Sequence, residues 1–128
     1  MTDELYDRGM KTRREVVGSE YLDRVLADVD PFTEPLQDLV TKYCWGEVWS
    51  RPGLSRRDRS IINLAALSAL NRPNELRIHV QGALNNGMTP EEIREVLLQI
   101  LIYCGAPAAL DSFRVAREVI RAHEAERG

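Results

Sequence analysis

The amino-acid sequence predicts an all-α fold, a single-domain helical bundle of about six to seven helices. Apolar residues recur at helical spacing along most of the chain, and almost nothing alternates with the period of two that strands require. Gly and Pro residues, with Ser, Thr or Asp beside them, divide the chain into segments of helical length. The 128 residues and 44% hydrophobic content are near those of one ordinary domain.

Three helices are expected in the first fifty residues. Residues 3–17 predict a charged, peripheral helix that ends at Gly18. Ser19 is expected to cap a short second helix over residues 19–29. Pro31 suits the first turn of a third helix. This helix carries the following apolar residues at helical spacing before "RPG" ends it: Leu36, Leu39, Val40, Tyr43, Cys44 and Val48.

The fourth helix is expected to be central and fully buried. Ser55, with Asp58 three residues later, resembles a capping box, and the helix then runs to about Asn71. Its apolar residues point in nearly every direction around the helix axis, which is typical of a helix without a solvent-facing side: Ile61, Ile62, Leu64, Leu67 and Leu70.

Three more helices complete the predicted bundle. Pro73 opens the fifth helix and Asn86-Gly87 closes it. Thr89 and Glu92 form a capping box for the sixth, which becomes apolar all round toward its end. The last helix covers residues 107–123. Because so small a bundle cannot bury residues 98–103 by itself, we expect a second copy to cover them in a homo-oligomer.

Composition argues against several classes of protein. The 17 Lys and Arg against 20 Asp and Glu give a net charge of −3, so no broad basic surface for nucleic acid is expected. No apolar run approaches the roughly 20 residues of a membrane span, and the N-terminus is acidic where a secretory signal is basic, so a cytoplasmic protein is expected. Cys44 and Cys104 lie 60 positions apart, form neither a CxxC pair nor a zinc set, and are expected to be buried free thiols.

The first candidate for chemistry lies in the fifth helix. Glu75, His79, Gly82 and Asn86 form a strip along the edge of an apolar stripe. A carboxylate one turn before an imidazole stabilises the protonated ring, and a glycine leaves room for a ligand. An exposed ion pair and a helix-packing glycine satisfy the same spacing. The other histidine, His123, lies in a charged tail and is expected to be solvated surface.

Two further features are candidates for a site. Arg56, Arg57 and Arg59 occupy the start of a helix, where the helix dipole disfavours cations, so an anionic ligand would compensate. Solvent exposure and pairing with Asp58 are the alternative.

Glu47 lies between Trp45 and Trp49, where an apolar surround would disfavour ionisation and suit the carboxyl group to acid–base work. An exposed glutamate and two core or interface tryptophans would give the same sequence.

The segments "SRRDRS", "ELRIHVQGALNNG" and "EVLLQILIYCGAPAA" resemble the carboxymuconolactone decarboxylase family, over about residues 32–122. The likeness is greatest to its 4-carboxymuconolactone decarboxylases. The resemblance implies an alkyl hydroperoxidase D-like helical fold assembled as a homo-oligomer, a hexamer in this family. It divides the chain into an N-terminal helical extension (1–30), the family's domain (31–123) and a polar tail (124–128).

The implied activity is the decarboxylation of 4-carboxymuconolactone to 3-oxoadipate enol-lactone in protocatechuate breakdown, the β-ketoadipate pathway. It requires no cofactor and no metal, because the conjugated lactone of this dicarboxylate substrate absorbs the electrons that the departing carboxylate leaves. From the chemistry of this implied reaction we assign a substrate-binding set and a catalytic set. Arg59, Arg57 and Trp49 bind substrate; His79 donates a proton, poised by Glu75, with Glu47 as the alternative donor.

Two other functions compete with this hypothesis. One is a thiol peroxidase or disulfide reductase of the same fold, although the positions of the CxxC of alkyl hydroperoxidase D are Arg72 and Glu75 here. The other is a non-catalytic helical module that binds a small acid. Whether the pocket lies within one chain or between two remains open at this stage.

Overall fold

The computed structural model describes residues 3–128, and within this range it contains seven α-helices, one π-helix and no strand. The prediction of an all-α fold is confirmed. The chain forms two compact units, one ending at Ser55 and the other comprising Arg56–Gly128. The predicted boundary at residue 30 therefore lies inside the first unit, and the first two residues of the predicted extension lie outside the described range.

The first unit contains four helical elements. They are α1 (Glu4–Val17), α2 (Ser19–Ala27), α3 (Glu34–Leu39) and the π-helix η1 (Val40–Val48). Helix α1 begins after Asp3, whose carboxylate accepts a hydrogen bond from the Tyr6 N–H, and ends at Gly18, where φ is 93°. The first helix is therefore as predicted. Gly18, and not Ser19, is the cap of α2.

The predicted start of the third helix at Pro31 is wrong. The Asp30 carboxylate accepts hydrogen bonds from the N–H groups of Phe32 and Thr33, both at 3.0 Å. This local bonding holds residues 30–33 as a turn, because an aspartate side chain offers backbone donors an alternative to the helix. The helix begins at Glu34 instead, with Pro35 in its first turn.

The apolar residues at helical spacing over residues 36–48 were expected to form the buried face of this helix, and that prediction is wrong. Leu36, Leu39, Tyr43 and Val48 are exposed. Cys44 is exposed with them and Val40 is half-buried, so the apolar stripe lies on the side that the single chain leaves open. The residues of η1 that are buried are Thr41, Trp45 and Gly46.

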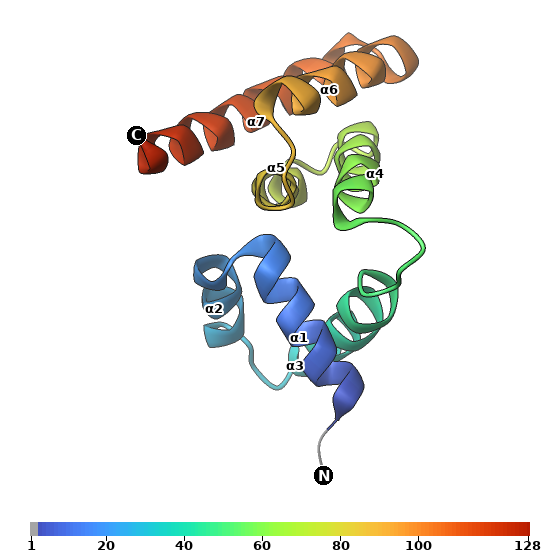
Figure 1. Ribbon diagram of the computed structural model, residues 1–128, viewed down its shortest axis with the longest axis vertical. Helices are drawn as coiled ribbons and strands as arrows, with labels where there is room; N and C mark the ends of the chain where they lie inside the picture. The colour runs from blue at the N-terminus through green and yellow to red at the C-terminus, as the bar shows by residue number, and fades with distance from the viewer. Residues whose placement is uncertain (1–2) are drawn as a thin grey trace. The chain divides into compact units, whose positions relative to one another are not determined.

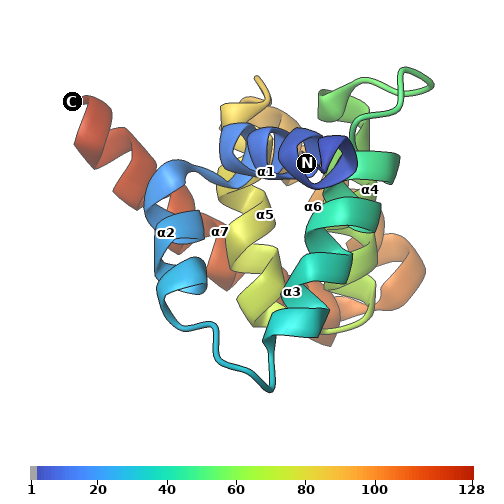
Figure 2. The same ribbon diagram turned by 90° about the horizontal axis from the view of Figure 1, so that it is seen from below.

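Helices α1 and η1 cross at very close range (Figure 2). A Cβ atom on Gly9 would lie 1.9 Å from the Thr41 carbonyl oxygen, and one on Gly46 would lie 2.5 Å from the Leu5 carbonyl oxygen. Arg8 spans the crossing and donates from Nε to the Gly46 carbonyl at 3.0 Å. The two glycines are therefore what allows the backbones of the first unit to approach.

The second unit contains four α-helices. They are α4 (Arg56–Ala69), α5 (Pro73–Asn85), α6 (Pro90–Cys104) and α7 (Ala106–Arg127), and Figure 1 shows α6 and α7 side by side. Their inward faces, with Met88 from the connection between α5 and α6, form one core of Leu64, Leu76, Val80, Ala83, Ile93, Leu97, Val115, Ala116 and Val119. No helix in residues 3–128 has the length and apolar character to cross a membrane.

Helix α4 is not fully buried, contrary to prediction. Ser60, Leu64 and Ser68 are its buried residues, whereas Ile62 and Leu70 are exposed. The small hydroxyl residues at either side of Leu64 allow α4 to pack closely with one face against its neighbours, and the other face carries the exposed apolar side chains.

The predicted capping box at the start of α6 is confirmed. Thr89 Oγ1 accepts from the Glu92 N–H at 3.1 Å and Glu92 Oε1 accepts from the Thr89 N–H at 3.0 Å, which completes the capping box. Gly87 before it has a φ of 95°. At the far end of α6, Ile102 and Tyr103 are more than three-quarters exposed in the single chain.

The prediction of buried cysteines is wrong, because both Cys44 and Cys104 are exposed residues. They belong to helix faces that the single chain leaves open. Partial burial nevertheless raises the pKa of the Cys44 thiol.

Candidate active site

The predicted site residues divide between the two units. Glu47 and Trp49 belong to η1 and the residue that follows it, in the first unit. The remaining ones lie on α4 and α5 of the second unit: Arg57, Arg59, Glu75 and His79.

His79 is the most strongly perturbed ionisable side chain of the second unit. It lies in the middle of α5, next to the buried residues Leu76, Val80 and Ala83. Burial lowers its pKa to about 4, because a charged imidazolium loses hydration there. The ring is therefore neutral at neutral pH.

We expected Glu75 to stabilise the protonated form of His79, which would raise the pKa of the ring. The pKa is lowered instead. Glu75 is exposed in the first turn of α5, where its carboxylate is well hydrated. Desolvation is the cause of the His79 shift, and it favours the uncharged ring.

Asn63 of α4 orients the imidazole. Its Nδ2 lies 3.4 Å from His79 Nδ1. Because an amide nitrogen only donates, Nδ1 accepts, and a neutral ring then carries its proton on Nε2. The chemistry available at His79 is therefore hydrogen-bond donation from Nε2.

Sequence reasoning missed Asn63, although a signal for it exists. Arg56, Ser60 and Asn63 are spaced four and three residues apart, which puts a polar stripe on a helix that is otherwise rich in apolar residues. Asn86 of α5 contacts the same stripe, donating from Nδ2 to Ser60 Oγ at 2.9 Å and to the Arg56 carbonyl at 3.4 Å. Polar contacts in the middle of α5 and at its C-terminal cap thus hold it in register with α4.

The arginines at the start of α4 have different surroundings. The Arg57 guanidinium is ion-paired with the Glu92 carboxylate of α6. The anion that the sequence led us to expect beside Arg57 is therefore supplied by the protein. Glu92 serves both the capping box and this ion pair. Arg59, one turn into α4, is partly buried.

Glu47 does not lie in the apolar surround that the sequence suggested. Trp45 and Trp49 are buried and stack with ring centroids 4.8 Å apart, while the Glu47 side chain is about half exposed. Residues four apart share a helix face and the residue midway between them does not. The Glu47 carboxylate accepts a hydrogen bond from Arg51 at 2.8 Å, as an exposed ion pair.

His123 is also not simply solvated surface. Its Nδ1 lies 3.2 Å from Gln81 Nε2 of α5, in a partly buried contact. Among residues 3–128, no three His, Cys, Asp or Glu side chains gather as ligands of a metal ion would.

Known proteins resemble the chain over most of its length. It is 43% identical over 116 residues to the nitrosuccinic acid decarboxylase npaB of Metarhizium robertsii, which covers 91% of this chain and 81% of that protein. It is 40% identical over 122 residues to a 4-carboxymuconolactone decarboxylase of Acinetobacter baylyi, covering 94% and 91% respectively. Both relatives are named as decarboxylases, and this chain is a carboxy-lyase.

The sequence profile of the carboxymuconolactone decarboxylase family matches residues 34–118. The match includes the whole of α4, α5 and α6, and with them the Asn63–His79 contact and the Arg57–Glu92 ion pair. It confirms the resemblance seen in the sequence, and the chain belongs to the carboxymuconolactone decarboxylase family.

Proposed function

We propose that the protein removes one carboxyl group, without a cofactor, from a small dicarboxylic acid that carries its own electron sink, and that 4-carboxymuconolactone is this acid. The observation that supports the proposal most is the 40% identity, over 94% of the chain, to an enzyme named for that substrate. The partly buried, neutral His79 supports the proposal as a candidate proton-bearing group.

Nitrosuccinate is a second candidate, because a relative 43% identical to the chain is named for it. The two acids share one chemical property. In the lactone, the electrons of the breaking carbon–carbon bond flow through a double bond to a carbonyl oxygen. In nitrosuccinate, they flow to the nitro group on the same carbon.

Each reaction needs the same three actions from the protein. The carbon–carbon bond to one carboxylate breaks and carbon dioxide leaves. The electron pair moves onto an oxygen of the lactone or nitro group, and the resulting anion takes a proton on carbon. The protein must hold the retained carboxylate, stabilise the oxyanion and supply the proton.

We assign two roles to His79: it stabilises the oxyanion and it delivers the proton to carbon. Donation from Nε2 stabilises the developing negative charge most strongly in a site poor in water. A bound dianionic substrate raises the pKa of the imidazole, since nearby negative charge favours the protonated ring. The ring is then able to deliver a proton in the complex although it is neutral in the free protein. Asn63 is a positioning residue that keeps Nδ1 as the acceptor.

We assign to Arg59 the role of binding the carboxylate that the substrate retains. The Arg57 guanidinium already pairs with Glu92, so its role is to hold the start of α4 to the start of α6. Trp49 remains a proposed substrate-binding residue. Glu47 remains the alternative proton donor and Glu75 a residue that tunes His79 from the preceding turn.

The substrate is tested by assaying the purified protein with freshly prepared 4-carboxymuconolactone and, separately, nitrosuccinate. Loss of ultraviolet absorbance and release of carbon dioxide are measured together. Faster turnover of the lactone supports the first candidate, and faster turnover of nitrosuccinate replaces it with the second. Release of carbon dioxide from neither acid contradicts both.

The residue assignments are tested by variants that are checked for native circular dichroism. His79→Gln is expected to lower kcat at least ~100-fold, on the usual scale of acid–base groups. His123→Gln is the matched control and is expected to keep wild-type turnover. Glu47→Gln tests the alternative donor: a comparable loss there, with little loss in His79→Gln, would move the proton transfer to Glu47.

Arg59 is expected to act on binding. Arg59→Ala should raise KM more than it lowers kcat, because it removes an ion pair with the substrate that is present both before and during the reaction. Arg127→Ala, at the exposed end of α7, is the control. An unchanged KM in Arg59→Ala would remove this residue from the site.

A further inference from the structure

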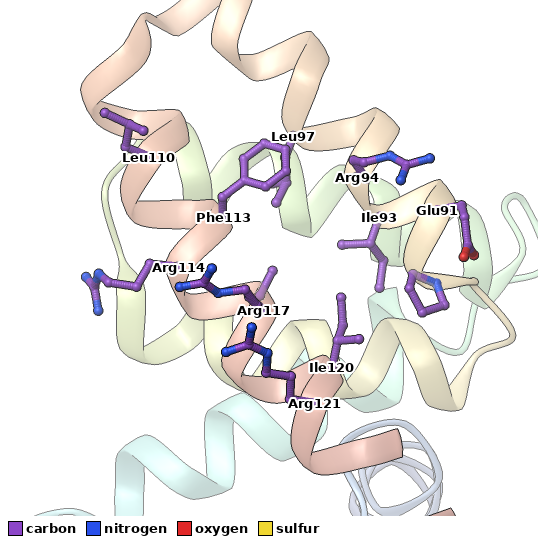
Figure 3. A pocket seen from close by; sticks show the side chains of 12 residues that line it. Glu91, Ile93, Arg94, Leu97, Leu110, Phe113, Arg114, Arg117, Ile120 and Arg121 are labelled. Carbon is purple, nitrogen blue, oxygen red and sulfur yellow. The ribbon is translucent and has the colours of Figure 1, made fainter. Parts of the chain in front are cut away.

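One groove of the second unit lies away from the predicted site residues. It has a volume of about 490 Å³ and runs between α6 and α7, and none of the candidate site residues lines it. Figure 3 shows its apolar side chains between the two helices, with Ile93 and Leu97 on one side and Phe113 and Ile120 on the other. From Leu110 to Arg121 it follows α7 for about 16 Å, the length of three helical turns.

Four arginines and Glu91 are the charged residues that border this groove, so positive charge predominates there. Arg114, Arg117 and Arg121 come from one side of α7, and Arg94 comes from α6 (Figure 3). Within residues 3–128, Arg117 and Arg121 have no ion-pair partner, and that of Arg114 is distant, at 3.6 Å. Like charges three and four residues apart on a helix repel one another. An apolar groove with this border suits a partner that is both apolar and acidic.

The chain itself contains such a segment, in the first unit. Residues 28–39, "DVDPFTEPLQDL", contain four acidic residues and no Lys or Arg. Phe32 is 91% exposed, Leu36 58% and Leu39 55%. Leu36 and Leu39 lie on α3 and Phe32 lies in the turn before it, so all three apolar side chains are open to a partner. Glu34, beside them, has no ion-pair partner within the described residues.

We propose that residues 28–39 of one copy of the chain bind in the α6–α7 groove of a second copy. Phe32, Leu36 and Leu39 cover the apolar floor, and Glu34 faces the arginines of α7. The contact joins two different surfaces, so each copy uses its segment toward one neighbour and its groove toward another. A heterologous contact of this kind builds a closed ring when the rotation between copies closes. The proposal is independent of the substrate.

The test is the mass of the protein in solution, measured by light scattering and sedimentation equilibrium. Wild type is expected to self-associate beyond the 14.6 kDa of one chain. Glu34→Arg and Arg121→Glu should each weaken association at least ~10-fold, because each places like charges across the contact. Glu20→Arg, in the first turn of α2, and Arg127→Glu, on α7 outside the groove, are the matched controls and should associate as wild type does.

Mixing the two variants tells a contact between copies from one within a copy. In an equimolar mixture, one contact pairs the unchanged Glu34 with the unchanged Arg121, and the next pairs the two reversed charges. Association should therefore recover. A contact within one chain would stay broken in each variant, so a mixture that fails to recover overturns the proposal.

Phe32→Ser provides a second test. The substitution should leave folding of the single chain unchanged, because the Phe32 side chain is 91% exposed there. It too is expected to weaken association. A monomeric wild type, or wild-type association in Glu34→Arg, Arg121→Glu and Phe32→Ser, would overturn the proposal.

Discussion

Partial burial of His79 makes the stability of the protein depend on pH. The pKa of the ring is about 4 in the folded chain, against 6.5 for an ordinary histidine. Between these values the unfolded chain binds a proton that the folded chain does not, so the free energy of unfolding rises with pH. The contribution is fully present above pH 6.5 and is lost as the pH falls toward 4.

The size of the effect follows from the difference of about 2.5 pKa units. At about 1.4 kcal/mol per unit, it amounts to roughly 3.5 kcal/mol when the pH is below both values. At pH 5 the unfolded ring is largely protonated and the folded ring largely neutral, which corresponds to about 2 kcal/mol less stability than at pH 8. Against a typical total of 5–15 kcal/mol this is readily measured.

The assay compares wild type with His79→Gln by urea unfolding at pH 8 and pH 5. The acidic residues titrate equally in both proteins, so their effects cancel in the difference. The stability of wild type relative to the variant should fall by about 2 kcal/mol between the two pH values. The imidazole is also followed directly by NMR, where a chain with two histidines gives few signals and the variant assigns one of them.

Two results would refute the reasoning. One is a difference between wild type and variant that stays constant from pH 8 to pH 5. The other is an NMR midpoint near 6.5 for His79, which would mean that water reaches the ring as freely as in an unfolded chain.

Three further changes test the fold and the chemistry. Gly9→Ala should destabilise the first unit by about 3 kcal/mol or more, seen in urea unfolding, because its methyl group would overlap an opposing carbonyl oxygen; wild-type stability would contradict the close crossing. Thr89→Ala should cost about 1 kcal/mol in the same measurement by removing the side chain that caps the Glu92 N–H, whereas Thr89→Ser should cost little. Replacing both Cys44 and Cys104 by Ser should leave decarboxylation at its wild-type rate, and a loss of turnover would favour thiol chemistry.

Sequence signals located the helices of the second unit because those signals are local. A proline in a first turn, a capping box or a glycine with positive φ acts on backbone groups within about four residues. The ends of α5 and the start of α6 are therefore readable from the chain alone, as Pro73, Gly87 and the pair Thr89–Glu92 illustrate.

The errors arose where a distant segment or a change of helix type determines the outcome. In the π-helix the buried residues are Thr41, Trp45 and Gly46, and Tyr43 and Val48 are exposed. One short aspartate turn moved the start of the helix before the π-helix. Glu47 was expected among apolar groups on the basis of its neighbours in sequence, but a residue midway between two stacked tryptophans lies on the other side of the helix.

The sequence by itself determined that the chain is helical, where most of its helices end, and to which family it belongs. Only the tertiary structure decided that His79 is neutral, that Asn63 leaves the proton on Nε2, and that Glu92 pairs with Arg57. The reason is physical. Helix ends depend on atoms a few bonds apart along the chain, whereas the charge of a buried ring depends on the water that other helices exclude from it.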